Sequence, residues 1–180
     1  MTAILNQHEN YLQADQAYGF PLLIKNLLSR AKVVSGNKKI HYADKTSYTY
    51  HEFFKRVNRL ANVLKGLNLQ KGDVIAVMDW DTHRYLECYF AIPMCGYILQ
   101  TVNVRLSEDK VLYTINHAKP KALLLNSEFS PMIKSHTQDA PSVEHVIWLD
   151  DNNTPMPPYA QGEYEAMLAQ ASDEYEFEDF

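Results

Sequence analysis

The chain has 180 residues, of which 46% are hydrophobic and 22% charged, a composition typical of a globular protein with one substantial core. Its formal net charge of −5 and its lack of basic clusters argue against nucleic acid or an anionic membrane as a partner. No apolar run approaches the roughly 20 residues of a transmembrane segment, and no basic stretch followed by an apolar core opens the chain. The composition therefore predicts a cytoplasmic protein.

The first 36 residues predict an extended arm followed by a helix. Residues 1–20 are polar with isolated apolar anchors and have too little to bury by themselves, so we expect an arm. Pro21 suits the first turn of a helix, and Gly36 ends the helical pattern. The apolar stripe of this helix consists of Leu22, Leu23, Leu27 and Leu28.

A small hairpin follows. Residues 39–42 and 46–50 alternate around the turn formed by residues 43–45, which predicts two antiparallel strands. Thr49 and Glu52 then have the spacing of a capping box at the start of a long helix.

The long helix has a clear apolar face, so we expect it to pack on a sheet. That face consists of Phe53, Val57, Leu60, Leu64 and Leu67. On the other side, the basic residues predict a surface in contact with solvent. They are Lys55, Arg56 and Arg59.

Strand and helix patterns alternate regularly after Gly72. Unbroken apolar runs predict strands at residues 74–78, 97–102, 121–125 and 145–149. Helical patterns predict helices at residues 82–95, 107–117 and 131–137, the second capped by Ser107. Pro93 predicts a bend or an early end in the first of these helices. The predicted fold class is α/β, with a parallel-rich βα sheet flanked by helices, an N-terminal arm and a small β-hairpin.

The chain divides into three predicted parts, with an arm at 1–20, an α/β subdomain at 21–149 and a linker region at 150–180. Within the last part, residues 150–158 predict a loop and residues 162–171 a short amphipathic helix. The acidic and aromatic residues that follow predict a tail that is mobile in isolation.

The segment DWDTH, residues 79–83, is the most suggestive local cluster, because ligands bind where apolar strands of an α/β sheet end. Two carboxylates and an imidazole could hold a metal or, as in phosphatases of the haloacid dehalogenase type, a phosphoryl group. The simpler interpretation is that Asp81 is the N-cap of the next helix and Asp79 a loop carboxylate. A contact to substrate at the edge of a site stays open for Asp79, Asp81 and His83.

The remaining residue types predict no catalytic or metal-binding residue in this chain. The seven histidines are scattered and lack the spacing of a zinc site. None of the six glycines forms a phosphate-cradling loop, so the chain alone is predicted to lack an ATP site. Cys88 and Cys95 share a helix face at roughly 10 Å, beyond disulfide reach, which predicts two small buried side chains.

Four segments together resemble the N-terminal region of the adenylate-forming acyl-CoA synthetases, the fatty-acid-CoA ligases in particular. They are YTYHEFFKRVNRLANVLK, KGDVIAVM, HRYLECYFAIPMCG and TVNVRLSEDKVLYTINHAKPKALL. The family commonly has Asn where Asp81 stands, a small departure. The final residues YEFEDF are similar to the acidic stretch before the family's phosphate loop, a Ser/Thr/Gly-rich run ending in Pro-Lys-Gly that this chain does not contain.

The resemblance implies an ATP-dependent ligase that joins a medium- or long-chain fatty acid, or another carboxylic acid, to CoA with Mg²⁺. In such enzymes the residues for both half-reactions lie beyond the position of Phe180. We therefore expect this chain to be an inactive scaffold and dimer surface, with the arm at 1–20 in the interface of a homodimer. The alternative is a stand-alone, non-catalytic interaction module derived from such a ligase.

The resemblance also suggests where CoA contacts this chain. In related synthetases the backbone of the corresponding stretch lies against the adenine of CoA, which makes Asn103, Val104 and Arg105 candidate CoA-edge residues. Arg105 could then pair with a phosphate. The alternative is structural: Asn103 fixes a turn, and Arg105 pairs with a carboxylate of a further domain.

Overall fold

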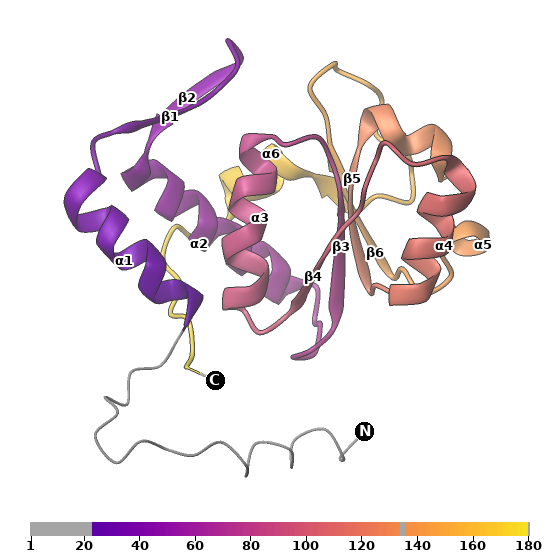
Figure 1. Cartoon of the computed structure of the whole chain (residues 1–180), viewed down its shortest axis with the longest axis horizontal. Helices are drawn as coiled ribbons and strands as arrows, with labels where there is room; N and C mark the ends of the chain where they lie inside the picture. Colours follow the sequence, from indigo (N-terminus) through magenta and orange to yellow (C-terminus); the bar gives the residue numbers. More distant parts are fainter. Residues whose placement is uncertain (1–22, 134–135, 180) are drawn as a thin grey trace.

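The computed structural model describes residues 23–133 and 136–179, and the predicted arm lies outside them (Figure 1). The helices are α1 (Ile24–Ser35), α2 (Tyr50–Gly66), α3 (His83–Met94), α4 (Glu108–Ala118), the 3-10 helix η2 (Ser127–Met132), α5 (His136–Asp139) and α6 (Tyr164–Gln170). The strands are β1 (Lys39–Tyr42), β2 (Thr46–Thr49), β3 (Val74–Met78), β4 (Ile98–Thr101), β5 (Ala122–Asn126), β6 (His145–Leu149) and β7 (Gly162–Glu163).

Two sheets organise the chain, and they confirm the predicted α/β class. Strands β3 to β7 form one parallel sheet in the order β4-β3-β5-β6-β7. Strands β1 and β2 form the predicted antiparallel hairpin, which extends away from the main sheet. Helices α2, α3 and α6 lie on one side of the parallel sheet and α4 and α5 on the other, so the sheet is the middle of three layers (Figure 1).

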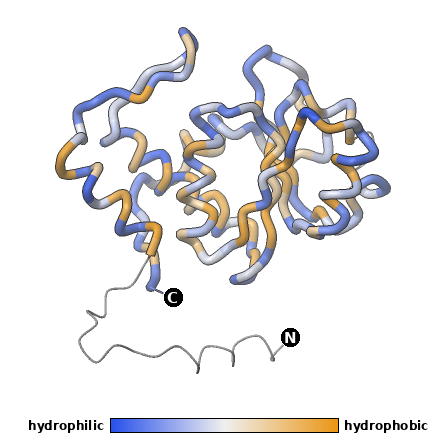
Figure 2. The backbone as a smooth tube through the Cα atoms, viewed as in Figure 1, coloured by the Kyte–Doolittle hydropathy of each residue, from blue (hydrophilic) through white to orange (hydrophobic). Residues whose placement is uncertain are grey.

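The core is split in two by the sheet, because successive residues of each strand face opposite layers. On β3, Ile75 and Val77 belong to the cluster under α2, α3 and α6, whereas Ala76 and Met78 belong to the cluster under α4. Strands β5 and β6 alternate in the same way. Figure 2 shows this apolar concentration along the central strands. The unbroken apolar runs therefore belong to a sheet that is covered on both faces, as the sequence predicted.

Helix α2 confirms its predicted start and its predicted face. The Thr49 hydroxyl accepts a hydrogen bond from the backbone N–H of Glu52 at 3.2 Å and caps the helix. All five predicted face residues are buried: Phe53, Val57, Leu60, Leu64 and Leu67.

Helix α1 buries less of its apolar surface than its sequence predicts. Leu28 is buried, but Leu27 is 70% exposed, and Val33 and Val34 are also exposed. The reason is that α1 lies outside α2 and α3 and contacts them with one side only. Pro21, the predicted first turn of this helix, and Leu22 of the predicted stripe lie outside the described residues.

The prediction of a solvated basic face on α2 is wrong for Arg56, whose side chain is only 14% exposed. Arg56 Nε donates to Glu87 Oε1 at 2.6 Å, and its two Nη atoms donate to Glu165 at 2.8 Å each. The hydroxyls of Tyr48 and Tyr164 also donate to Glu87, each at 2.6 Å. These five residues, here called the Arg56 cluster, join the hairpin, α2, α3 and α6.

Three further elements differ from the sequence prediction. In place of one helix at residues 131–137, the chain forms the 3-10 helix η2 from Ser127 and then the short α5, with residues 134–135 outside the described part. Pro131 lies inside η2. The first two residues of the predicted helix at 162–171 instead form β7, a fifth parallel strand beside β6.

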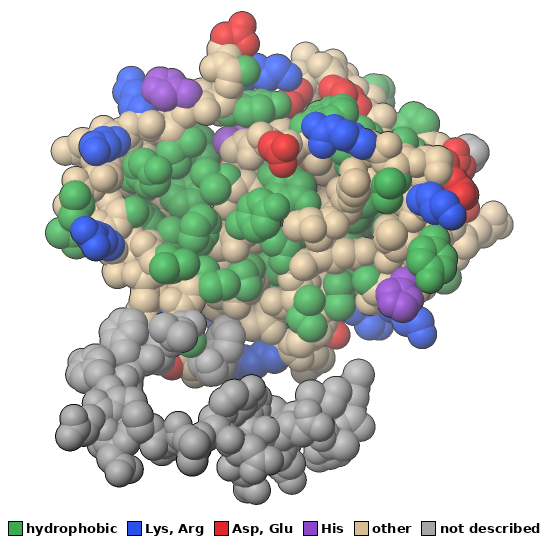
Figure 3. All heavy atoms as spheres, in the orientation of Figure 1, with side chains coloured by type: hydrophobic (Ala, Val, Ile, Leu, Met, Phe, Trp, Pro, Cys, Tyr) green, Lys and Arg blue, Asp and Glu red, His purple; other side chains and the backbone are tan. Residues whose placement is uncertain are grey.

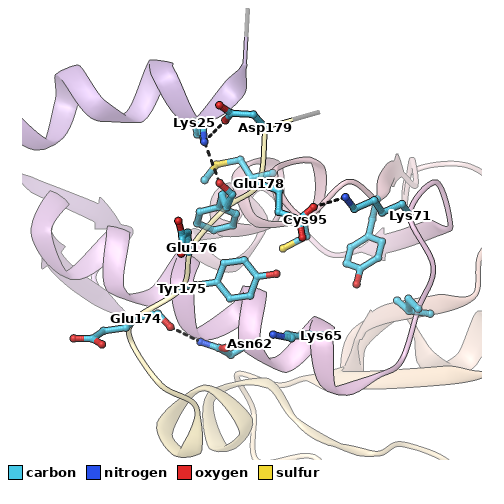
Figure 4. Close-up of a pocket in the computed structure, with 14 residues that line it drawn as sticks. Lys25, Asn62, Lys65, Lys71, Cys95, Glu174, Tyr175, Glu176, Glu178 and Asp179 are labelled. Carbon is cyan, nitrogen blue, oxygen red and sulfur yellow. Dashed lines mark hydrogen bonds and ion pairs between the residues drawn. The ribbon is translucent and has the colours of Figure 1, made fainter. Parts of the chain in front are cut away.

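The described tail, residues 172–179, packs against the molecule near the amino ends of β3 and β4 (Figure 4). Asn62 Nδ2 donates to the carbonyls of Ser172 and Glu174 at 2.9 Å each, and Lys25 Nζ to that of Phe177 at 3.0 Å. Lys71 pairs with Glu178. The tail thus lines a cavity of about 770 Å³, and its mobility in isolation stays a prediction.

Candidate functional site

The candidate site lies at the carboxyl ends of the parallel strands. Numbered from β3, the strand order is 2-1-3-4-5, so the chain reverses direction across the sheet between β3 and β5. Ligands of open α/β sheets bind in the crevice outside such a switch point. The loops that meet there begin with Asp79 after β3, Val102 after β4 and Ser127 after β5.

The crevice between β3 and β5 is closed by a buried carboxylate. Asp79 is 3% exposed, and its Oδ1 accepts hydrogen bonds from Asn126 Nδ2 at 2.6 Å and from the backbone N–H of Trp80 at 2.9 Å. Its Oδ2 accepts one from the Thr82 hydroxyl at 2.6 Å. With both oxygens occupied by protein donors, Asp79 fixes the loop and has little capacity left for a ligand.

The expected role of Asp81 as helix N-cap is wrong. Thr82 caps α3, because its hydroxyl accepts from the backbone N–H of Tyr85 at 3.3 Å, while Asp81 is exposed at the loop surface. His83 points elsewhere: its Nε2 lies 3.2 Å from Glu165, next to the Arg56 cluster. Asp79, Asp81 and His83 thus have different surroundings, and among residues 23–133 and 136–179 no three His, Cys, Asp or Glu side chains gather as a metal site would need.

Arg84 supplies the buried positive charge of this edge. Its side chain is 1% exposed, with Nη1 at 3.0 Å from Asp151 and Nε at 3.7 Å from Asp79. Burial lowers the pKa of an arginine, but the charges of Asp79 and Asp151 outweigh it and raise the pKa of Arg84. At this edge of the sheet the positive charge of Arg84 therefore compensates the negative charges of Asp79 and Asp151.

The opening lies on the other side of β3, between the loops that follow β3 and β4. It is a cavity of about 240 Å³, here called the carboxyl-edge cavity. Asp81 and Trp80 line it from the β3 loop, Tyr85 and Tyr89 from α3, and residues 101–105 from the β4 loop. The structure thus brings together two segments that the sequence singled out separately.

All three candidate CoA-edge residues line this cavity. Val104 is 7% exposed and packs into the core under α4. Asn103 Oδ1 accepts from the backbone N–H of Arg105 at 3.1 Å, which fixes the turn. Arg105 itself is exposed, and its guanidinium lies over the ring of Trp80, 5.6 Å from the ring centre.

The sequence analysis singled out the segment that contains Trp80 but assigned Trp80 itself no role, and it did not identify Tyr85 and Tyr89. The Trp80 indole Nε1–H donates to Glu128 Oε2 at 2.9 Å, and its ring meets Phe129 edge-on at 4.9 Å between centres. The Arg105 guanidinium lies over the same indole. The position of Trp80 shortly after a buried strand, at the edge of the sheet where ligands bind, is the sequence feature that could have indicated its role.

This arrangement can bind an anion next to flat or apolar surfaces, but it contains no activated nucleophile. The two cysteines are free thiols; the prediction of a small buried side chain is confirmed for Cys88, whereas Cys95 is only partly buried. Burial raises the pKa of Cys88, which is fully buried, and that of Cys95 to about 11. Tyr85 and Tyr89 offer aromatic surface, and burial raises the pKa of Tyr85.

None of the helices in the described part of the chain is both long and apolar enough to cross a membrane.

Comparison with known proteins gives consistent matches. The family model described as "AMP-binding enzyme" matches residues 29–175. A long-chain-fatty-acid–CoA ligase of Thermus thermophilus is 32% identical over 130 residues, which cover 70% of this chain and 24% of the relative. A peroxisomal benzoate–CoA ligase of Arabidopsis thaliana is 32% identical over 142 residues, or 79% of this chain and 23% of that protein. The chain therefore spans about a quarter of the length of these relatives.

A solved structure supports the fold. The anthranilate CoA ligase AuaEII, in complex with anthranoyl-AMP, superposes with a TM-score of 0.76 at 22% identity, over 85% of this chain and 29% of that one. At this level of identity, the likeness is evidence of a shared fold alone.

Proposed function

The chain belongs to the AMP-binding enzyme family, and from this premise we propose that it is the N-terminal part of an ATP-dependent acyl-CoA ligase. The observation that carries the proposal is the family match over residues 29–175, within which the carboxyl-edge cavity is formed. In the complete protein, a carboxylate attacks the α-phosphorus of ATP and releases pyrophosphate. The CoA thiol then attacks the acyl carbon of the adenylate and releases AMP.

The described residues do not fit the ATP half of this reaction. The sequence has no Gly-rich loop whose amides could converge on a triphosphate, and two acidic side chains near the site are already paired within the fold. Both oxygens of Asp79 accept hydrogen bonds from protein donors, and Asp151 pairs with Arg84. We therefore assign this chain no catalytic residue, and its 180 residues alone are proposed to be inactive.

The residues of the carboxyl-edge cavity fit the CoA half better. Arg105 is a permanent cation at the cavity mouth, and no carboxylate forms an ion pair with it in the part of the chain that the structure describes. Asn103 fixes the turn that presents it, and buried Val104 anchors the same loop. The geometry supports Asn103, Val104 and Arg105 as the CoA edge, with Arg105 on a phosphate.

The acid that we propose is a medium- or long-chain fatty acid, in keeping with relatives that are named as long-chain and medium-chain fatty-acid–CoA ligases. The cytoplasmic location stays a prediction, because the names of other relatives include peroxisomal enzymes.

The homodimer also stays a proposal, and it is supported by the exposed apolar residues of α1, the helix that follows the arm. They are Leu27, Val33 and Val34. Figure 3 shows further apolar side chains on the α3 side of the molecule, where Tyr89 and Ile98 are exposed. Deleting residues 1–18 from the complete protein should shift a dimer to monomer in light scattering. An unchanged dimer would count against the arm as its interface.

The test of the proposed function uses the protein as it is naturally produced. Its full coding sequence should continue past Phe180 into a Thr/Ser/Gly-rich loop followed by Pro-Lys-Gly. The purified protein should form an acyl-CoA thioester from ATP–Mg²⁺, CoA and a panel of fatty and aryl acids, with release of AMP. A protein that ends at Phe180, or one that forms no thioester with any acid, would favour the non-catalytic module.

A further inference from the structure

We propose that Trp80 is a positioning residue, whose indole face holds the Arg105 guanidinium at the mouth of the carboxyl-edge cavity, ready to bind a phosphate of CoA. The inference rests on the proposed function, because it takes CoA as the ligand of Arg105. It adds a residue outside the three predicted CoA-edge residues, and it explains how an exposed arginine is kept in place.

Trp80 is itself fixed by three contacts. Its backbone N–H donates to the buried Asp79 at 2.9 Å, and its indole N–H donates to Glu128 at 2.9 Å. Its ring packs against that of Phe129, which is buried, with 4.9 Å between the ring centres. These contacts connect the indole to the loops after β3 and β5. The ring is therefore a rigid surface beside the cavity, although the side chain is 36% exposed.

Arg105 has no comparable anchor of its own. Within residues 23–133 and 136–179 the Arg105 side chain forms no hydrogen bond or ion pair, and its guanidinium lies over the indole, 5.6 Å from the ring centre. A free arginine side chain samples many rotamers, and binding a phosphate would require all but a few of them to be lost. An aromatic surface under the guanidinium reduces that loss before the ligand arrives.

The type of contact matters because of where the arginine donors point. A guanidinium that stacks on a ring uses its face, so its N–H groups, which lie in the plane, stay free for a bidentate contact to phosphate. A carboxylate partner would occupy those same N–H groups. Trp80 can therefore orient Arg105 without competing with the ligand.

The alternative role for Trp80 is purely structural, as a cover over Phe129. The two roles differ in a double-mutant cycle. If Trp80 acts through Arg105, its replacement has no further effect on CoA binding once Arg105 is gone. If Trp80 only supports the fold, its replacement weakens CoA binding by the same factor in both backgrounds.

The experiment measures CoA dissociation constants by titration calorimetry on the complete protein. Trp80→Leu should weaken binding by about two- to fivefold, the size of an exposed cation–π contact. Arg105→Ala should weaken it by about tenfold to a hundredfold, as for a lost charge-assisted hydrogen bond. The double variant should bind no more weakly than Arg105→Ala alone. Trp80→Phe keeps an aromatic face and should stay within about twofold of the wild type.

Two further variants serve as control and reserve. Tyr113→Leu replaces another exposed aromatic residue, on α4 outside the cavity, and should leave CoA binding unchanged. Glu128→Ala leaves the indole present but frees its N–H, and it replaces Trp80→Leu in the cycle if that variant does not fold. It should weaken CoA binding in the same direction and lose its effect when Arg105 is alanine.

The outcomes separate this inference from the proposed function. If Trp80→Leu leaves the CoA dissociation constant unchanged, or if the effects of the two single variants multiply in the double variant, Trp80 does not position Arg105, while the CoA edge stands. If Arg105→Ala itself leaves CoA binding unchanged, the CoA edge is wrong, and the positioning role falls with it.

Discussion

Arg56 and Arg105 lie in opposite surroundings, and the difference indicates what each does. Arg56 is buried between two carboxylates, with hydrogen bonds of 2.6 to 2.8 Å to Glu87 and Glu165. Arg105 is exposed, lies on an indole ring and has no ion pair in the described part of the chain. The donors of Arg56 are used up inside the fold, whereas those of Arg105 are open to a ligand. One arginine stabilises the structure, and the other is available for binding.

Removing Arg56 should have the largest effect. Arg56→Ala leaves Glu87, which is fully buried, without its counter-charge and should lower the free energy of unfolding by about 3–5 kcal/mol. Urea denaturation checks this. The matched control is Arg59→Ala, on the same helix, whose ion pairs with Glu52 and Asp173 are partly exposed and should be worth less than about 1 kcal/mol. Equal losses for the two variants would break the distinction between buried and exposed arginines.

Acid should weaken the Arg56 cluster through Glu165. Burial raises the pKa of this carboxyl, but hydrogen bonds from His83 and Arg56 and the charge of Arg56 outweigh it and lower the pKa from 4.5 to about 2. A pKa that is lower in the folded state gives stability that is fully present above about pH 4.5 and is lost as the pH falls toward 2. Glu165→Gln should flatten this part of the profile of melting temperature against pH. An unchanged slope would show that other carboxyls cause it.

Asn62 should have an intermediate and local effect. Asn62→Ala removes two hydrogen bonds to tail carbonyls, worth about 0.5–1.5 kcal/mol each, and should speed hydrogen exchange and proteolysis at residues 172–179. The control is Asn116→Ala, which loses similar bonds to Leu112 and Asp139 away from the tail. It should leave the tail protected. A tail that is equally labile in the wild type would contradict the path seen here.

The exposed pair Lys71–Glu178 should have the smallest effect. Both side chains are more than half exposed, so Lys71→Ala should leave the free energy of unfolding nearly unchanged. Raising the salt concentration to 1 M should have a similarly small effect on the wild type, because it screens exposed pairs. A loss as large as that of Arg56→Ala would mean that burial does not decide the strength of these ion pairs.

The local elements could be predicted from the sequence, since their causes are local. The Thr49 cap, the apolar face of α2 and strands β3 and β6 follow from spacing and periodicity, and the structure places each where it was expected. The strand β7 could not be predicted, because two residues carry no periodicity.

Contacts between distant residues explain what the sequence did not reveal. The carboxylates that bury Arg56 are 31 and 109 positions away, so its helix position alone suggested a solvated face. In the same way, Trp80 meets Glu128 at a separation of 48 positions. Asp81 and Thr82 are neighbours that can both cap a helix, so the sequence did not distinguish them. The Thr82 hydroxyl donates to the buried Asp79 and accepts from the backbone N–H of Tyr85, which places Thr82 at the cap.

The central claim is that Arg105 binds CoA and takes no part in the fold or in acid activation. It is tested most directly by comparing Arg105→Ala with the wild type of the complete protein in two assays, acid-dependent pyrophosphate exchange and thioester formation. We predict an unchanged melting temperature and nearly unchanged pyrophosphate exchange. The KM for CoA should rise about 10- to 150-fold, which corresponds to about 1.5–3 kcal/mol of lost binding. Equal damage to exchange and to thioester formation would contradict the claim and make Arg105 a structural residue.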